Sequence, residues 1–114
     1  MIKKINRFHG YGSLRFTYRR GLTVRGPLCS VKYTKNLKKK TYRLAVVVNK
    51  KVNKSAVVRN KIRRVVYENI RSFEKDIKSP HDIVVTIYSD QILELPKAEL
   101  DTMLRSQFHQ AKLI

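Results

Sequence analysis

The sequence predicts a single-domain α+β sandwich in which helices pack on a four-stranded, mainly antiparallel sheet, in the order α-β-β-β-α-β-α. Three observations support this fold class. The length of 114 residues suits one domain, and the apolar content of 42% is typical of globular chains. The apolar period also alternates along the chain between helical and extended spacing. No internal repeat or proline-rich linker interrupts residues 1–114, so we treat them as one domain.

The first half of the chain predicts one helix and three strands. A short helix is expected over Ser13–Arg20, and Gly21 ends it, because glycine is favoured just past a helix C-terminus. Residues 22–26 and 27–34 are rich in β-branched and aromatic residues, which favours two strands joined by a turn. The nearly continuous apolar run at residues 42–49 indicates a central strand covered on both faces.

The second half predicts two helices with a strand between them. Residues 55–74 carry the longest helical pattern, with Ser55 as a plausible N-cap and the apolar residues gathered on one side. Residues 83–88 are apolar and β-branched, as in a fourth strand. A final helix is expected over residues 96–110, because proline is tolerated in the first helical turn.

The charge is large and unevenly distributed. The formal net charge is +18, and residues 1–75 contain 22 Lys or Arg against two carboxylates. Residues 76–114 contain four Lys or Arg against six carboxylates. Such an excess of positive charge indicates what kind of partner a protein binds rather than which fold it adopts. No apolar stretch approaches the roughly 20 residues that cross a bilayer, and the N-terminus lacks the apolar run of a secretory signal. We therefore expect a cytoplasmic protein without a membrane partner.

Enzymatic chemistry by the chain itself is poorly supported. A single cysteine, Cys29, excludes an internal disulfide and a cysteine-based zinc site, and a small buried strand residue is its simplest interpretation. Metal-dependent nucleases need clustered carboxylates, which the basic part of the chain lacks. His9, His81 and His109 are far apart in sequence and have no evident partner. We expect no catalytic side chain and no metal site.

Nucleic acid is the best-supported partner. Lysine and arginine neutralise phosphates and release counterions, and Arg and Asn form paired hydrogen bonds with phosphates or base edges. The candidate RNA-binding residues are Lys50, Lys51, Lys54, Arg59, Asn60, Lys61, Arg63 and Arg64. Tyrosines among basic residues can stack unpaired bases, although each fits half-buried packing equally well. The lysine run at residues 38–40 fits RNA contact or a solvated loop. No series of residues suggests reading of a DNA major groove, so we favour RNA.

The stretch KKVNKSAVVRNKIRRVVYE resembles the basic helix of the bacterial ribonuclease P protein subunit family. The family hallmark is Ala-Val-x-Arg-Asn-x-x-(Lys/Arg)-Arg after a Lys-Lys pair, and residues 50–51 and 56–64 match it. In the family's first helix, two aromatics precede a glycine by seven and three residues. Leu14 and Tyr18 hold those places before Gly21.

The resemblance implies a ribosomal protein S5 domain 2-like fold and a role as the protein subunit of an endoribonuclease. In that enzyme a catalytic RNA, which mainly holds the Mg²⁺, removes the 5′ leader of precursor tRNA. The basic residues would contact this RNA, and the single-stranded leader would lie in a cleft between the first helix and the sheet. Leu14, Tyr18, Val31 and Tyr33 match the apolar contacts of that cleft. The alternative is a structural ribosomal RNA-binding protein of similar fold; a stand-alone nuclease is disfavoured by the few carboxylates.

Four positions depart from the family pattern. Leu14 replaces an aromatic residue, and Asn53 replaces a glycine before the basic helix, where Asn would accept left-handed backbone geometry. Asn49 replaces a small polar residue, and Tyr67 replaces a basic one on the side of the helix expected to carry the cations. None of the four removes the Arg-Asn motif.

Overall fold

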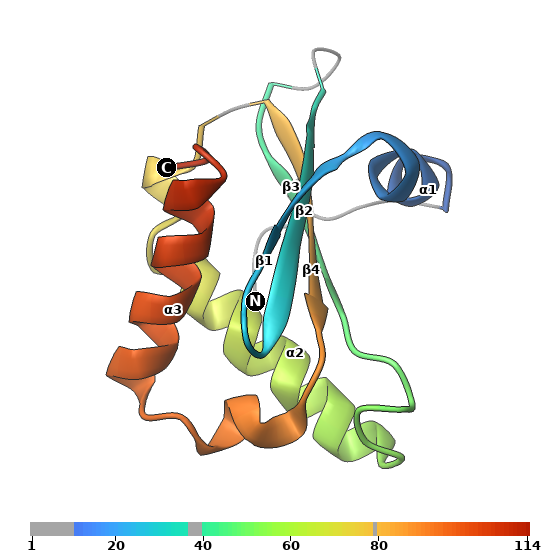
Figure 1. Ribbon diagram of the computed structural model, residues 1–114, viewed down its shortest axis with the longest axis vertical. Helices are drawn as coiled ribbons and strands as arrows, with labels where there is room; N and C mark the ends of the chain where they lie inside the picture. Colours follow the sequence, from blue (N-terminus) through green and yellow to red (C-terminus); the bar gives the residue numbers. More distant parts are fainter. Residues whose placement is uncertain (1–10, 37–39, 79) are drawn as a thin grey trace.

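The computed structural model describes residues 11–36, 40–78 and 80–114, with side chains from residue 16 onward. His9, Lys38, Lys39 and the side chain of Leu14 therefore lie outside the described part. The elements are α1 (Tyr11–Arg20), β1 (Leu22–Arg25), β2 (Cys29–Lys35), β3 (Arg43–Val47), α2 (Ala56–Arg71), η2 (Glu74–Asp76), β4 (His81–Ile87), η3 (Asp90–Glu94) and α3 (Lys97–Gln110). This sequence of helices and strands confirms the predicted order, with two short 3₁₀ helices, η2 and η3, in addition (Figure 1).

The four strands form one mixed sheet in the order β1-β2-β4-β3. β2 is antiparallel to both β1 and β4, whereas β3 is parallel to β4. The prediction of a central strand at residues 42–49 is wrong, because β3 lies at the edge of the sheet. Its apolar run has another cause. α2 packs against β3, and the Tyr67 hydroxyl accepts a hydrogen bond from the Val46 backbone N–H at 3.1 Å.

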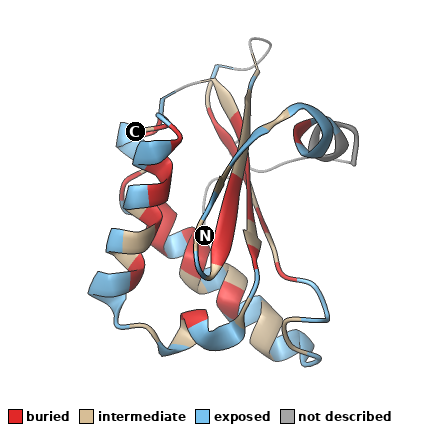
Figure 2. Ribbon diagram, in the orientation of Figure 1, coloured by how far each residue is buried: buried red, intermediate tan, exposed pale blue. Residues whose placement is uncertain are grey.

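The main core lies between one face of the sheet and the helices α2 and α3. Figure 1 shows these two helices on the same side, and Figure 2 shows that their buried stripes face the strands. The core-facing strand residues include Val31, Leu44 and Ile83, none of which is exposed. Phe73 and Phe108 join the helical layer edge to face, with ring centres 5.2 Å apart. This core gives α2 a fixed position and leaves its other side to solvent.

α1 packs on the opposite face, against β2 and β4. Its Thr17 is fully buried. Gly21 follows the helix, and a Cβ at this position would lie 2.4 Å from the Thr17 carbonyl oxygen. Only glycine therefore lets the chain pass so close to the helix as it enters β1.

A buried ion pair lies on the α1 side of the sheet. Arg43 of β3 and Asp82 of β4 are register partners. The Arg43 guanidinium donates to Asp82 through Nε at 2.8 Å and Nη2 at 2.7 Å. Asn36 Nδ2 also donates to this carboxylate at 2.9 Å. The two-pronged pairing satisfies charges that are almost fully withdrawn from water.

Candidate nucleic-acid interface

Short side chains fix the loop that leads into α2. Ser55 caps the helix as predicted, since its Oγ accepts a hydrogen bond from the Val58 N–H at 3.3 Å. The Asn53 side chain accepts from the Ser55 N–H at 2.9 Å and donates to Asp90 Oδ2 at 3.0 Å. Asn49 Oδ1 accepts from the Lys51 N–H at 2.9 Å. Both asparagines that depart from the family pattern therefore hold the loop in place.

The geometry expected at Asn53 is not found. Among the described residues, Lys112 is the one non-glycine residue with a positive φ, so the backbone at Asn53 does not enter the left-handed region. A glycine is not required there. The side chain of Asn53 instead supplies two hydrogen bonds that a glycine would lack.

The predicted RNA-binding residues all lie in the loop before α2 and in the first half of that helix. We call this set the basic surface: Lys50, Lys51, Lys54, Arg59, Asn60, Lys61, Arg63 and Arg64. Six of them are exposed, and Arg59 and Arg63 are half-buried. The Arg59 guanidinium donates to the carbonyl oxygens of Asn53 and Lys54, both at 2.9 Å. Arg63 donates to the side-chain oxygen of Asn60. The loop therefore orders Arg59, and the motif's own Asn60 orders Arg63.

The positive charge of the basic surface is not neutralised internally. Within the described parts of the chain, none of its cations forms an ion pair with a carboxylate. The ion pair on α2 itself, between Arg71 and Glu68 at 3.5 Å, is exposed and lies one turn beyond the basic surface. The helix is held by its buried side, where Ile62, Val66 and Ile70 enter the core. Tyr67, predicted on the basic side, is buried and turned toward β3 instead.

Tyr18 and Lys32 form the second group of candidate contacts, on the α1 side of the sheet. Lys32 Nζ donates to the Tyr18 carbonyl oxygen at 2.8 Å and lies 5.5 Å from the centre of the Tyr18 ring. The Tyr18 hydroxyl is 3.5 Å from Thr86 Oγ1 on β4. Tyr18 remains 38% exposed, so part of its ring is open to a ligand.

Val31 and Tyr33 do not join Tyr18, contrary to the predicted cleft. Successive strand residues point to opposite faces, and Lys32 of β2 is the residue that contacts α1. Val31 is therefore fully buried in the core on the far face. Tyr33 packs against the same core, with its ring edge to face with His81 at 6.4 Å. A shift of one residue moves a whole strand pattern to the other face. Ser30 and Lys32, rather than Val31 and Tyr33, are therefore the β2 residues on the α1 side of the sheet.

Tyr88 is a candidate that the sequence analysis missed. It directly follows β4, and alternation from Thr86 places it on the α1 side. Its N–H donates to the Leu28 carbonyl at 2.8 Å, which fixes the backbone, while 47% of the residue is exposed. An aromatic residue at the end of an apolar strand, followed by Ser89 and Asp90, was the available signal.

The described residues offer neither a metal cluster nor an activated thiol. They contain no group of three or more His, Cys, Asp or Glu side chains that could hold a metal ion. Burial raises the pKa of the Cys29 thiol to about 11, and the thiol donates to Gln107 Oε1 at 3.2 Å. The prediction that Cys29 is a buried strand residue is confirmed. None of the described helices is long and apolar enough to span a membrane.

Together, the fold and the basic surface define a small α+β protein of the RNA-binding class. The ribonuclease P family model matches residues 2–112, and the chain belongs to this family, whose members act in tRNA processing as part of a ribonucleoprotein. The predicted family and fold are thereby confirmed.

Sequence relatives and solved structures support the assignment. The chain is 39% identical over 82 residues to the ribonuclease P protein component of Clostridium botulinum, covering 71% of this chain and 72% of that protein. It is 34% identical over 83 residues to the Clostridium acetobutylicum counterpart, covering 72% and 69%. A solved structure of a Staphylococcus aureus RNase P protein mutant, defective in mRNA degradation activity, superposes with a TM-score of 0.86 at 25% identity, covering 97% and 92%. The Thermotoga maritima RNase P protein gives 0.77 at 25% identity, covering 88% and 92%.

Proposed function

We propose that this chain is the protein subunit of a cytoplasmic ribonuclease P, and that it binds the catalytic RNA and the 5′ leader of precursor tRNA. One observation carries the proposal: a member of this family presents a set of exposed or half-buried cations that no carboxylate of the described residues neutralises. Polyanionic RNA is the partner that such a set suits, because each neutralised phosphate releases counterions.

The basic surface is the proposed contact with the catalytic RNA. Arg59 and Arg63 are ordered by hydrogen bonds to the loop and to Asn60, so less side-chain entropy is lost when they meet phosphates. Lys50, Lys51 and Lys54 extend the same surface along the loop. Alanine at Arg59 and Arg63 should weaken binding more than alanine at two lysines outside this surface.

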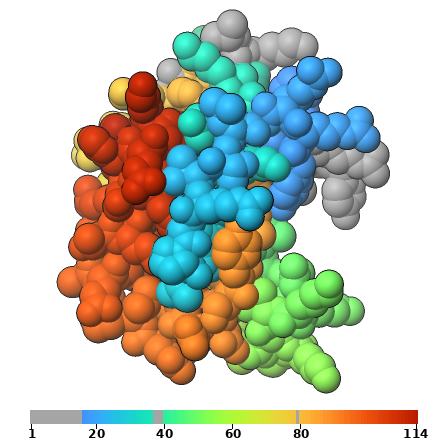
Figure 3. Space-filling model, viewed as in Figure 1, coloured from blue at the N-terminus to red at the C-terminus, as the bar shows by residue number. Residues whose placement is uncertain are grey.

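The α1 side of the sheet is the proposed site for the leader. Figure 3 shows the blue residues of α1 and the green residues that lead into α2 on the same side of the molecule. Tyr18, Lys32 and Tyr88 belong to this side, and they combine partly exposed rings with a cation. Stacking on aromatic rings beside a positive charge suits unpaired bases of any sequence, which is what a set of tRNA leaders requires.

Hydrolysis of the leader is assigned to the RNA subunit, which would hold the Mg²⁺. The described residues of this chain do not fit a metal site, since they lack a suitable cluster of ligands. We therefore assign them positioning of the two RNA segments and no chemical step.

The test compares Tyr18→Ala with Tyr33→Ala in holoenzyme reconstituted with the catalytic RNA. Stacking of one base is worth about 1–3 kcal/mol, so Tyr18→Ala should weaken precursor tRNA binding at least about fivefold and leave binding of leaderless tRNA unchanged. Tyr33→Ala should lower stability and leave the ratio of the two affinities unchanged, because its ring packs on the core side. Equal losses for both tRNAs in Tyr18→Ala would contradict the leader site.

The RNA partner can be identified directly. The tagged protein is purified from its own cells, the bound RNA is sequenced, and the material is incubated with Mg²⁺ and a precursor tRNA. One structured, non-ribosomal RNA together with cleavage of the 5′ leader is expected. Ribosomal RNA without cleavage would instead support a structural ribosomal protein.

A further inference from the structure

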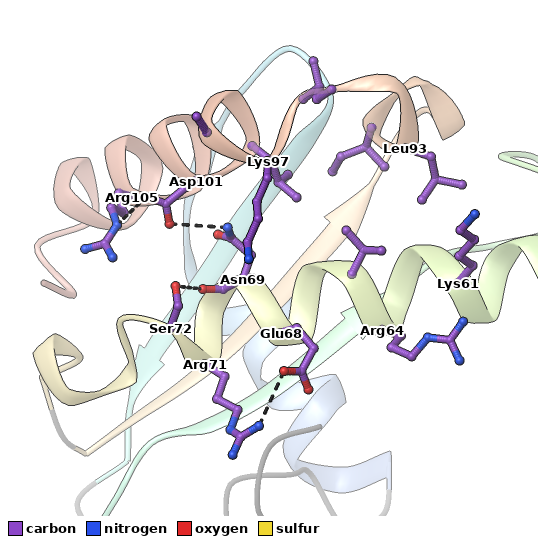
Figure 4. Close-up of a pocket in the computed structure, with 15 residues that line it drawn as sticks. Lys61, Arg64, Glu68, Asn69, Arg71, Ser72, Leu93, Lys97, Asp101 and Arg105 are labelled. Atoms are coloured by element: carbon purple, nitrogen blue, oxygen red, sulfur yellow. Dashed lines mark hydrogen bonds and ion pairs between the residues drawn. The ribbon is translucent and has the colours of Figure 1, made fainter.

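A groove with a volume of about 1120 Å³ separates α2 from η3 and α3. Figure 4 shows the two helices on either side, with aliphatic side chains between them. Its apolar floor includes Val65 of α2 together with Ile92, Leu93 and Leu95 from η3 and the turn that follows. Leu93 and Leu95 are only half-buried, so apolar surface on this floor remains in contact with water.

The rim of the groove carries an excess of positive charge. Its two carboxylates are already paired: Glu68 with Arg71 at 3.5 Å, and Asp101 with Arg105 at 2.8 Å. Three exposed cations, Lys61, Arg64 and Lys97, have no ion pair among the described residues. Figure 4 shows Lys97 reaching from α3 toward α2. The groove therefore favours a ligand that carries both negative charge and apolar surface.

Asn69 adds an unsatisfied polar atom to the wall of this groove. The residue is 6% exposed, and its Nδ2 donates to Asp101 Oδ1 at 3.3 Å. Its Oδ1 is buried and has no hydrogen-bond partner among the described residues. A buried acceptor without a donor is destabilising, and a ligand with an N–H group would relieve that cost.

We propose that this groove binds an unpaired segment of the same catalytic RNA. Lys61 and Arg64 belong both to the basic surface and to the rim, so an RNA strand that leaves the basic surface enters the groove directly. Phosphates lie at the rim cations, bases pack on the apolar floor, and a base amino or imino group donates to Asn69 Oδ1. An acidic peptide would match the charge, but continuity with the basic surface favours RNA. The inference rests on the proposed function.

Site-directed cross-linking tests the occupant. Cys29 is buried with a raised pKa, so a new exposed cysteine can be labelled selectively with an aryl azide. Lys97→Cys places the probe on the rim, Val57→Cys places it beside the basic surface at a residue 78% exposed, and Ser106→Cys places it on α3 away from the groove. Each labelled protein is bound to the catalytic RNA and irradiated, and the cross-linked nucleotides are mapped.

Cross-links from Lys97→Cys to unpaired nucleotides, near those reached from Val57→Cys, are the expected result. Cross-links from Val57→Cys alone, with Lys97→Cys at the background of Ser106→Cys, would overturn the groove proposal and leave the proposed function standing. An absence of cross-links from both positions would count against the proposed function itself. In cell extract, a protein cross-linked at Lys97→Cys with no RNA would identify a peptide ligand and refute RNA.

A charge reversal gives an independent measurement. Lys97→Glu should lower the logarithmic salt slope of binding to the catalytic RNA by about 0.7, the contribution of one single-strand phosphate. Lys75→Glu is the matched control, because Lys75 is exposed in η2, does not line the groove and changes the net charge equally. Equal slopes for the two variants would refute a phosphate contact at Lys97.

Discussion

The two faces of the sheet are built from alternate residues of the same strands, yet they are covered differently. On one face, Val31, Leu44 and Ile83 are completely buried under α2 and α3. On the other, α1 covers β2 and β4, while Lys32 and Thr86 stay half-exposed and polar. The first face contributes most of the stability through apolar burial. The second gives up part of that burial and keeps polar and aromatic groups available to a ligand.

The largest expected effect comes from the apolar face. Phe108 is fully buried and packs against Phe73, so Phe108→Ala should lower the free energy of unfolding by about 4 kcal/mol. Thr86→Ala on the α1 side should change it by less than about 0.5 kcal/mol. Urea unfolding followed by circular dichroism measures both variants. Similar losses from the two substitutions would mean that the two faces contribute equally to the free energy of unfolding.

The buried ion pair is the exception on the polar face. Asp82→Asn leaves the Arg43 charge buried without its counter-charge and should cost about 3 kcal/mol of unfolding free energy. Arg71→Ala removes an exposed pair and should cost less than about 1 kcal/mol. The double variant Arg43→Met/Asp82→Leu sharpens the comparison, since it should recover much of the loss in the same urea assay. If Asp82→Asn is as mild as Arg71→Ala, the pair is solvated in solution.

The smallest effect is a pH dependence that originates on the apolar face. Burial raises the pKa of Cys29 from 9.0 to about 11, so above pH 9 the thiol ionises in the unfolded chain first. Proton loss then favours the unfolded state, and the free energy of unfolding should fall between pH 9 and 11 by at most about 1.4 kcal/mol per unit. Cys29→Ser should flatten this slope in urea titrations across that range.

Tyr42 is a second contributor to the pH dependence of the free energy of unfolding. Burial, and then the hydrogen bond to Glu74 at 2.7 Å, raise the pKa of Tyr42 as well, and this acts in the same direction at the upper end. If the free energy of unfolding falls with pH at the same slope in the parent and in Cys29→Ser, the whole effect belongs to Tyr42, and Cys29 does not contribute.

The periods of apolar residues were sufficient to predict the order of the elements, and Ser55 as the cap of α2 followed from local chemistry. The position of β3 was not predictable, because its burial comes from α2 and Tyr67 rather than from a second neighbouring strand. The resemblance to the family assigned Val31 and Tyr33 to the leader cleft, whereas the structure places both on the core side of the sheet. The alternation itself was informative, since Cys29 and Val31 share the face of Tyr33 and are apolar enough for the core.

The groove between α2 and α3 had no sequence signal. It joins side chains of residues 61–72 to those of residues 92–105, and the distance between these segments is set only when the sheet fixes both helices. The unsatisfied oxygen of Asn69 is likewise a property of the packed helices. A helical pattern assigns Asn69 to a side of α2 but does not show what it meets there.

The strand order has a consequence for how the chain folds. Among the strands that the structure describes, β3 pairs only with β4, which is inserted between β2 and β3 although it follows both in sequence. A nascent chain that has just completed α2 can form the β1–β2 hairpin, but its third strand still lacks a neighbour. Closure of the sheet must await residues 81–87 and includes a long-range parallel pairing, which is intrinsically slow. Until then the cation-rich segment is attached to an unpaired strand, so the binding-competent arrangement cannot form before β4 joins the sheet.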